Sequence, residues 1–120
     1  MGLPGFPNDQ TFVLLDHRPG SVFRWLQSCD TPGLAFVVID PLVFVPEYPI
    51  EKARSAASFV GLDHAEELIV LVICTVPPPP AEPTANFLAP IAIGQASRRG
   101  AQVVLHDSGY TSAATFLRRS

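Results

Sequence analysis

The side chains that are able to carry chemistry are scattered along the 120-residue chain. The three histidines each stand beside an aspartate, as Asp16-His17, Asp63-His64 and His106-Asp107. Neighbouring residues in a strand point to opposite faces, so these pairs do not predict a triad or a ligand set. The sequence also lacks a nucleophile elbow, a zinc-protease motif and a glycine-rich phosphate loop. We therefore expect exposed turn histidines, no enzymatic activity, no cofactor and no metal.

The cysteines and the acidic residues of the middle segment do not indicate a metal site either. Cys29 and Cys74 stand in apolar stretches without a C-x-x-C companion, which fits neither a zinc site nor a small disulfide scaffold. We expect both to be buried, reduced thiols. The spacing of four glutamates matches no calcium-binding loop, and we expect most of them on a solvated face. They are Glu47, Glu51, Glu66 and Glu67.

The formal net charge of −3 argues against a general nucleic-acid binder. The charge is uneven, because residues 30–82 are acidic and residues 83–120 are basic. The arginine pairs 98–99 and 118–119 are able to reach RNA phosphates, but they lack interleaved aromatic residues, so direct RNA binding ranks last among the alternatives.

The hydropathy of the chain predicts no membrane partner. The longest apolar run, residues 68–76, is less than half of the length that spans a bilayer. The opening residues 1–5 have turn chemistry where a secretion leader needs a charged and then apolar stretch. We expect a soluble cytoplasmic protein that contacts neither membrane nor nucleic acid directly.

Glu47 and Tyr48 stand between Pro46 and Pro49, where the backbone is rigid. Their side chains should not turn inward easily, and an aromatic ring on a rigid loop loses little entropy when it docks. An interface anchor and ordinary loop packing both remain open for this pair. Asn86 precedes an apolar run that ends at Pro90, and it should cap or turn the chain.

The elements that must position these residues are mostly short strands. We expect one helix that begins at Ile50 and stops at Gly61, because apolar residues recur there at helical spacing. Residues 42–45 lie among prolines, which predicts an edge or an irregular segment, and residues 77–80 form a proline spacer. The pattern predicts a mainly β protein, a small antiparallel β-barrel-like single domain over residues 1–120 with one short helix. The expected strands are 11–15, 22–26, 34–39, 68–76, 86–93 and 102–106.

Several ordered segments resemble the flagellar assembly factor FliW family over nearly the whole chain. LAFVVIDP at residues 34–41 and ANFLAPIAI at residues 85–93 are the specific matches. GLPGF at residues 2–6, Phe44-x-Pro46-Glu47-Tyr48 and RRGAQVVL at residues 98–105 follow the same order.

This resemblance implies a protein that catalyses nothing and exchanges protein partners in the cytoplasm. Members of the family bind newly made flagellin. When flagellin is exported, the freed protein binds the translational repressor CsrA and lifts repression of flagellin mRNA, an antagonism that is allosteric in the family. The acidic middle segment suits a basic RNA-binding partner. By matching segment, the leading contact residues are Phe44, Glu47 and Tyr48, followed by Asn86 and Phe87.

The start of the chain departs from the family pattern. Family members begin roughly two strands before the GLPGF turn, whereas Met1 here directly precedes Gly2. Without those strands an antiparallel barrel exposes a hydrophobic edge that invites pairing with another chain. Three explanations are open: the start codon is misplaced, another segment or chain covers the edge, or this is a degenerate copy. We expect the first. We expect a monomer, with edge-strand association if the upstream strands are truly absent.

A second class of function remains open from the composition alone. A small β-barrel that binds a ligand in its interior fits the strand count and the apolar content. A pocket of several hundred cubic ångströms favours this alternative, and an interior filled by side chains counts against it.

Overall fold

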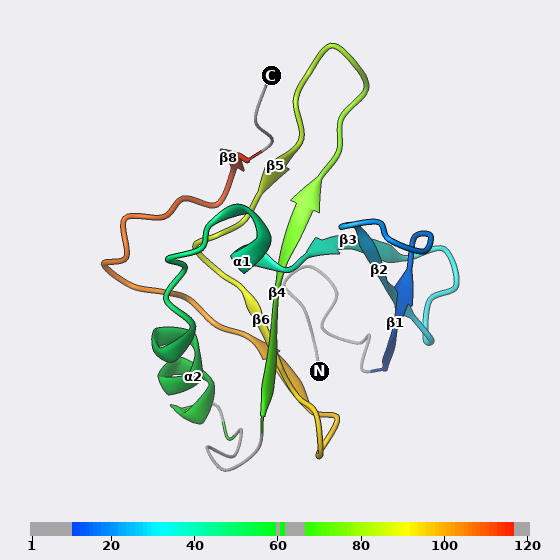
Figure 1. Cartoon of the computed structure of the whole chain (residues 1–120). Helices are drawn as coiled ribbons and strands as arrows, with labels where there is room; N and C mark the ends of the chain where they lie inside the picture. The colour runs from blue at the N-terminus through cyan, green and yellow to red at the C-terminus, as the bar shows by residue number, and fades with distance from the viewer. Residues whose placement is uncertain (1–10, 60, 62–66, 117–120) are drawn as a thin grey trace.

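The chain folds around an antiparallel sheet, and the computed structural model describes residues 11–59, 61 and 67–116 (Figure 1). The GLPGF segment, His64, Glu66 and the arginines at 118–119 lie outside the described residues. Eight strands and two short helices follow one another in the chain. They are β1 (Phe12–Asp16), β2 (Arg24–Ser28), β3 (Ala35–Ile39), α1 (Pro41–Phe44), α2 (Ile50–Phe59), β4 (Leu68–Thr75), β5 (Thr84–Ala85), β6 (Ile91–Gly94), β7 (Gly100–Gln102) and β8 (Ala114–Thr115).

The first three strands form a meander that the turn residues between them dictate. β1 pairs antiparallel with β2, with Leu14 opposite Leu26, and β2 pairs with β3, with Leu26 opposite Phe36. Gly20 adopts a φ of 78° in the first connection, a conformation that costs glycine little. These three apolar side chains therefore share one face of the sheet.

β4 is the longest described strand and joins two sections of the sheet, β1–β3 with β5 and β8 on one side and β6–β7 on the other. One half pairs with β3, with Val38 opposite Ile73, and the other half pairs with β6, with Val70 opposite Ala92. Adjacent residues Val38 and Ile39 of β3 are both fully buried although they point to opposite faces. The prediction of a strand buried on both faces at residues 34–39 is confirmed.

The two faces of the sheet bury different apolar clusters. Ile39 and Val72 belong to the first cluster, and Leu26, Val38 and Leu71 belong to the second. Alternation along β3 and β4 sends successive side chains into each cluster in turn. β4 is thus the strand that both clusters share.

The structure contains two short helices where the sequence predicted one. Asp40 caps α1, since its side chain accepts a hydrogen bond from the Leu42 backbone N–H at 3.0 Å, and Pro41 occupies the first helical turn. The prediction of an edge or irregular segment at residues 42–45 is therefore wrong. The helix expected from Ile50 is confirmed as α2, which packs on the sheet through the fully buried Ala53 and Ala57.

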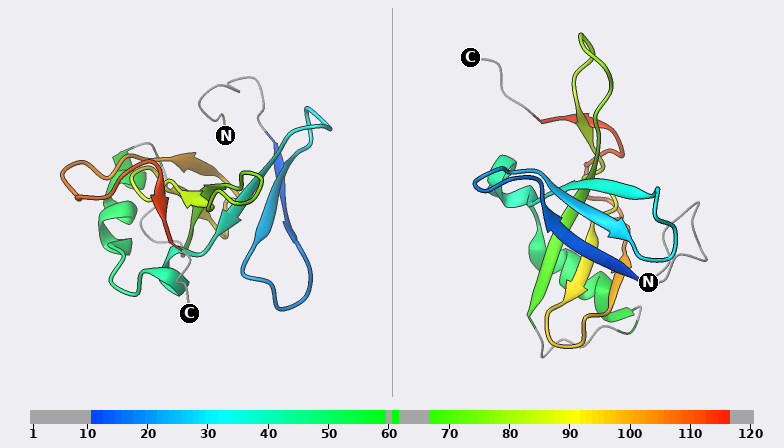
Figure 2. Two further views of the ribbon diagram at one scale, coloured as in Figure 1. Left: turned by 90° about the horizontal axis from the view of Figure 1, so that it is seen from above. Right: turned by 90° about the vertical axis from the view of Figure 1, so that its right-hand side faces the viewer.

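The prediction of a mainly antiparallel β fold is confirmed, but the sheet is not closed into a barrel. Among the described strands, β1 pairs with β2 alone and β7 pairs with β6 alone. A barrel needs hydrogen bonds between its first and last strands, and β1 and β7 form none. Among the described strands β1 and β8 end the main strand order, and β7 ends a branch that leaves β4 through β6 (Figure 2).

Two expected strands in the second half are shorter than predicted. Of the predicted residues 86–93 only 91–93 lie in β6, and of the predicted residues 102–106 only Gln102 lies in β7. β6 begins directly after Pro90, because proline has no N–H to donate to a strand ladder. The prolines at 77–80 lie in a protruding loop between β4 and β5 (Figure 1), where the Ala81 N–H donates to the Pro78 carbonyl at 3.2 Å.

Candidate functional site: the α1 turn and its aromatic support

Three of the five predicted contact residues, Phe44, Tyr48 and Phe87, belong to one aromatic cluster. The Tyr48 hydroxyl donates a hydrogen bond of 2.5 Å to the Phe87 carbonyl, and the two rings lie 5.8 Å apart between centroids. Tyr110 packs against both rings, at 5.1 Å from Tyr48 and 6.1 Å from Phe87. The loop after α1 is thus joined to the segment after β5 by a hydrogen bond and by ring packing.

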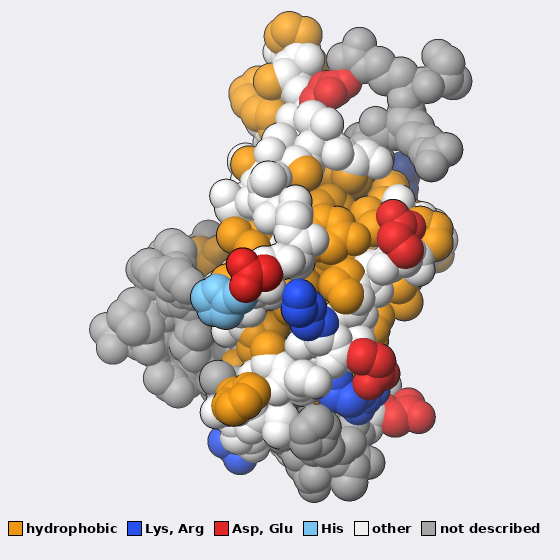
Figure 3. Space-filling model, turned by 90° about the vertical axis from the view of Figure 1, so that its left-hand side faces the viewer, with side chains coloured by type: hydrophobic (Ala, Val, Ile, Leu, Met, Phe, Trp, Pro, Cys, Tyr) orange, Lys and Arg blue, Asp and Glu red, His pale blue; other side chains and the backbone are white. Residues whose placement is uncertain are grey.

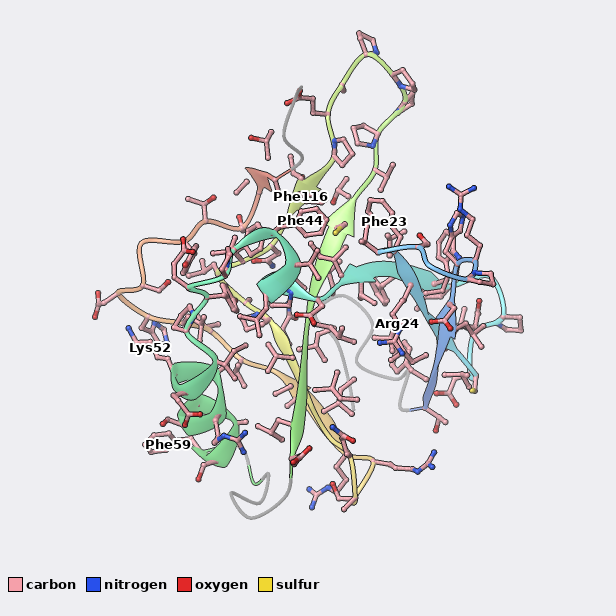
Figure 4. All side chains as sticks on the ribbon, viewed as in Figure 1. Phe23, Arg24, Phe44, Lys52, Phe59 and Phe116 are labelled. Atoms are coloured by element: carbon pink, nitrogen blue, oxygen red, sulfur yellow. The ribbon has the colours of Figure 1, made fainter. Side chains whose placement is uncertain are left out.

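Phe44 extends this cluster to the end of the described chain. Its ring meets Phe116 edge to face with centroids 4.9 Å apart, and Phe116 in turn lies 6.4 Å from Phe87. Figure 4 shows Phe44 and Phe116 side by side above α1. Edge-to-face pairs of this kind add about 0.5–1.5 kcal/mol to area burial. The aromatic cluster consists of Phe44, Tyr48, Phe87, Tyr110 and Phe116.

The expectation that the Tyr48 side chain stays outward is wrong. Tyr48 and Phe87 are each only 3% exposed, because the flanking prolines fix the backbone but leave the ring free to enter the core. Burial, and secondarily the nearby Tyr110, raises the pKa of the Tyr48 phenol well above its ordinary value of 10.0. Tyr48 is therefore a neutral hydrogen-bond donor that supports the loop.

Exposed side chains lie on the solvent side of the aromatic cluster. Leu42 and Val43 of α1 are 42% and 57% exposed, Phe44 is half-buried and Glu47 is exposed. We call these four residues the α1 patch. Figure 3 shows hydrophobic side chains on the face that carries α1 and α2, with acidic and basic groups around them. Large apolar side chains gathered beside a carboxylate in this way are typical of protein contact surfaces.

Glu47 also acts on the aromatic cluster electrostatically. Desolvation, and secondarily the Glu47 carboxylate, raises the pKa of Tyr110. The negative charge of Glu47 therefore disfavours a tyrosinate beneath it.

Asn86 has a local structural role. Its side-chain oxygen accepts a hydrogen bond from the Ala89 N–H at 3.0 Å, and its own N–H donates to the Ile73 carbonyl at 2.9 Å. The predicted turn role of Asn86 is confirmed. Asn86 holds the segment from which Phe87 enters the cluster.

Two members of the aromatic cluster and the exposed half of α1 were not predictable from the sequence pattern. Tyr110 and Phe116 lie in a tail with weak periodicity, and their only signal was that they are aromatic residues in an otherwise small and polar stretch. The sequence predicts Leu42 and Val43 in an edge or irregular segment. Their exposure follows from the helical turn that Asp40 caps.

The remaining chemistry-bearing side chains do not converge. His17 and His106 are exposed, and the His17 ring lies 6.0 Å from that of Trp25. Cys74 is buried but Cys29 is exposed, so the prediction of two buried thiols is wrong for Cys29, which stands just beyond the end of β2. Within the described ranges, no three histidine, cysteine or acidic side chains are placed to hold a metal ion. No helix in the described part of the chain has the length and hydropathy to cross a membrane.

A groove lies on the other side of the sheet from the aromatic cluster. It has a volume of about 660 Å³ and is lined by residues from the start of β1 and from the turn between β6 and β7. It opens to solvent at the unclosed seam of the sheet. Under the ligand-binding alternative, the pocket would lie in the interior of a barrel. This groove is instead a surface feature between two strand edges.

Fold and site together define the class of this protein: an open antiparallel sheet that displays an apolar turn on an aromatic support. A family model described as "FliW protein" matches residues 1–116. The chain belongs to the FliW family, a non-enzymatic family of flagellar assembly factors.

Curated relatives and a solved structure agree with this assignment. The chain is 39% identical over 110 residues to the flagellar assembly factor FliW of Caldanaerobacter subterraneus subsp. tengcongensis, covering 91% of this chain and 73% of that protein. It is 38% identical over 111 residues to that of Bacillus subtilis (strain 168), covering 92% and 78%. A crystal structure of the flagellar assembly factor FliW matches with a TM-score of 0.84 at 33% identity, covering 98% of this chain and 81% of that one.

Proposed function

We propose that this protein binds flagellin and antagonises the translational repressor CsrA by partner switching, and so controls flagellin translation. It acts as a single-domain monomer in the cytoplasm, by stoichiometric binding. The observation that supports this proposal most directly is the α1 patch, because it exposes apolar side chains at a segment that resembles the family pattern. Membership of the FliW family supplies the class of partner.

The α1 patch has the composition of a binding surface. Leu42 and Val43 lose water when a partner covers them, at about 25 cal/mol per Å² of apolar surface. Glu47 at the edge of the patch favours a partner that is basic nearby, as an RNA-binding repressor must be. Phe44 and Glu47 are therefore the proposed contact residues among the five that the sequence indicated.

The other three residues contribute through position. Tyr48 and Phe87 are nine-tenths or more buried, so they hold the α1 turn in position and do not meet a partner directly. Asn86 fixes the segment that carries Phe87. A rigid support reduces the entropy that α1 loses on docking, which strengthens binding without adding a contact.

Isothermal titration with the cognate flagellin and, separately, with the cognate CsrA tests the proposal. We expect measurable heat with both, and we expect flagellin added in excess to prevent CsrA binding. Absence of heat with both partners excludes the proposal. Simultaneous binding of both at full affinity excludes partner switching and leaves only the separate binding functions.

A charge placed in the α1 patch locates the contact. Val43→Asp should weaken binding of at least one partner about tenfold or more, because the aspartate must be desolvated against an apolar partner surface. Leu15→Asp is the matched control, since Leu15 is 46% exposed but lies on β1. Equal affinities of the two variants for both partners would place the contact elsewhere. Unchanged thermal unfolding shows that each variant is folded.

A further inference from the structure

The loop between β4 and β5 is longer than its two ends require. Residues 76–83 form it, and we call them the proline loop. Thr75 and Thr84, which flank the loop, lie directly opposite each other in the β4–β5 ladder. Strand ends that are already opposite need a connection of about two to five residues, whereas this loop has eight, of which five are prolines. The proline spacer predicted at residues 77–80 therefore spans no distance.

The proline loop exposes apolar side chains on a rigid backbone. Val76 is 55% exposed, residues 78–81 are exposed, and the loop protrudes at one end of the sheet (Figure 1). Each proline ring fixes φ, and the hydrogen bond from the Ala81 N–H to the Pro78 carbonyl closes the turn. The loop consequently loses little conformational entropy when a partner covers it.

The prolines of the loop offer hydrogen-bonding groups of one kind. Proline has a backbone carbonyl but no N–H, so these five residues accept hydrogen bonds and donate none. A partner surface rich in carboxylates or carbonyls would lose its hydrogen bonds to water against them. A pocket of aromatic side chains suits the loop, because ring faces pack on proline and the Trp N–H or Tyr O–H donates to the carbonyls.

The base of the proline loop is held close to the α1 patch. Thr84, directly after the loop, lies opposite Thr115 of β8, and the next residue, Phe116, meets Phe44 of the patch at 4.9 Å between ring centroids. Strand spacing and residue rise put the Phe44 ring within roughly 20 Å of Thr84. Figure 3 shows the loop at the top of the face that carries α1.

The α1 patch alone is too small for a specific interface. Such interfaces bury about 800 Å² on each partner, from about 20–30 residues, and this area is roughly 30 Å across. The α1 patch has four residues, so its partner must cover neighbouring surface as well. A partner that covers the patch and extends over β8 reaches the proline loop.

We propose that the proline loop and the α1 patch belong to one interface, and that the protein partner which covers the patch receives the loop in a pocket of aromatic side chains. This inference rests on the proposed function, which supplies the partners. The patch contributes the centre of the interface, and the loop contributes a rigid protrusion that fixes the orientation of the partner.

A shortened loop tests the proposal. Replacing residues 76–83 by Asn-Gly keeps Thr75 opposite Thr84, because a two-residue turn of this kind joins opposite strand positions. Isothermal titration is performed with the cognate flagellin and, separately, with the cognate CsrA. Each partner whose binding Val43→Asp weakens should bind the shortened loop about tenfold more weakly or worse. A partner that Val43→Asp leaves unchanged should bind it within threefold of the original affinity.

A point variant covers the case in which the shortened chain fails to fold. Val76→Asp keeps all five prolines but places a carboxylate that must lose its water against aromatic rings, so binding should weaken about fivefold. Val22→Asp is the matched control, because Val22 is 42% exposed and lies in the connection between β1 and β2. Thermal unfolding shows that each variant is folded. Equal affinities of Val76→Asp and Val22→Asp overturn the proposal.

A photocrosslinker identifies the partner surface. Benzophenone introduced at position 76 should crosslink to a partner segment that contains tryptophan, tyrosine or phenylalanine, located by mass spectrometry. Val43→Asp should reduce the yield of this crosslink. Crosslinks confined to segments without an aromatic residue contradict the proposed pocket.

The remaining outcomes separate this inference from the proposed function. If the original chain gives no heat with either partner, the proposed function fails and this inference fails with it. If the shortened loop keeps the original affinity for a partner that Val43→Asp weakens, only this inference fails. Weakening by the shortened loop without any weakening by Val43→Asp contradicts a shared interface. A dimer of the original chain that the shortened loop abolishes in sedimentation assigns the loop to a second copy.

Discussion

At the scale of single residues, the Tyr48 hydroxyl is the link with the clearest energetic consequence. It joins two segments that are 39 residues apart in the chain, and it does so inside the core. Removing a donor from a buried carbonyl leaves that carbonyl without its partner, which costs more than the hydrogen bond itself contributes.

Tyr48→Phe should lower the free energy of unfolding by about 1–2 kcal/mol, measured by urea denaturation. Tyr110→Phe is the control, because the Tyr110 ring is only half-buried and a smaller loss is expected. Because the folded-state pKa of Tyr48 is raised above its unfolded value, its contribution is complete below pH 10 and is lost as pH rises further. Stability should therefore fall less steeply above pH 10 in Tyr48→Phe than in the original chain. Parallel alkaline profiles would contradict the buried phenol.

The two thiols should react at very different rates. Cys29 is exposed, whereas burial raises the pKa of the Cys74 thiol from 9.0 to about 12. We expect a disulfide reagent to modify one thiol rapidly in the native protein and the second only on unfolding. In Cys29→Ser the rapid phase should vanish. A second rapid phase that persists in Cys29→Ser would show that Cys74 is accessible.

At the scale of elements, α1 depends on its cap because it has one turn. Asp40→Ala should destabilise the protein by about 1 kcal/mol, since the Leu42 N–H loses its acceptor. Asp40→Asn keeps an acceptor at the cap and should cost only a few tenths of that. Chemical denaturation of both variants measures the difference. Equal losses would mean that the charge, rather than the cap, supports α1.

The strands were predictable where the sequence pattern is local, and α1 was not. The β-branched run at residues 34–39 predicts a strand buried on both faces, and the burial of Val38 and Ile39 confirms it. In α1 the same apolar character is overridden by Asp40 and Pro41, a capping pair that acts at one turn only. A proline before an apolar stretch is compatible with both an edge strand and a first helical turn. The position of the proline alone therefore does not distinguish an edge strand from a first helical turn.

The candidate site was predictable only in part, because its support is assembled over long distances in the chain. The sequence placed Phe44 and Tyr48 in one segment and Phe87 in another, but nothing local indicates that Tyr48 donates to the Phe87 carbonyl. Tyr110 and Phe116 were missed for the same reason. The side-chain direction of Tyr48 follows from tertiary packing, which a rigid loop does not determine.

At the scale of the whole molecule, β4 connects the two sections of the sheet, so these sections should unfold together. Val72 is fully buried in β4, and Val72→Ala should cost about 2–3 kcal/mol through lost apolar burial and a small cavity. Fluorescence of Trp25, the only tryptophan of the sequence, reports on β2, and far-UV circular dichroism reports on all strands. The unfolding midpoints that the two signals report should shift by the same amount in Val72→Ala. Separate midpoints would mean that the two sections of the sheet unfold independently. Val43→Ala, at an exposed site, is the control and should move neither midpoint.

The aromatic cluster also sets when the α1 turn becomes supported during synthesis of the chain. Phe44 rests on Phe116, and Tyr48 rests on Phe87 and Tyr110, so the α1 turn has its full support only once the last described residues are available. A chain still emerging from the ribosome displays Leu42 and Val43 on an unsupported backbone. Synthesis of Phe116 is thus the step that completes the aromatic support beneath the α1 patch.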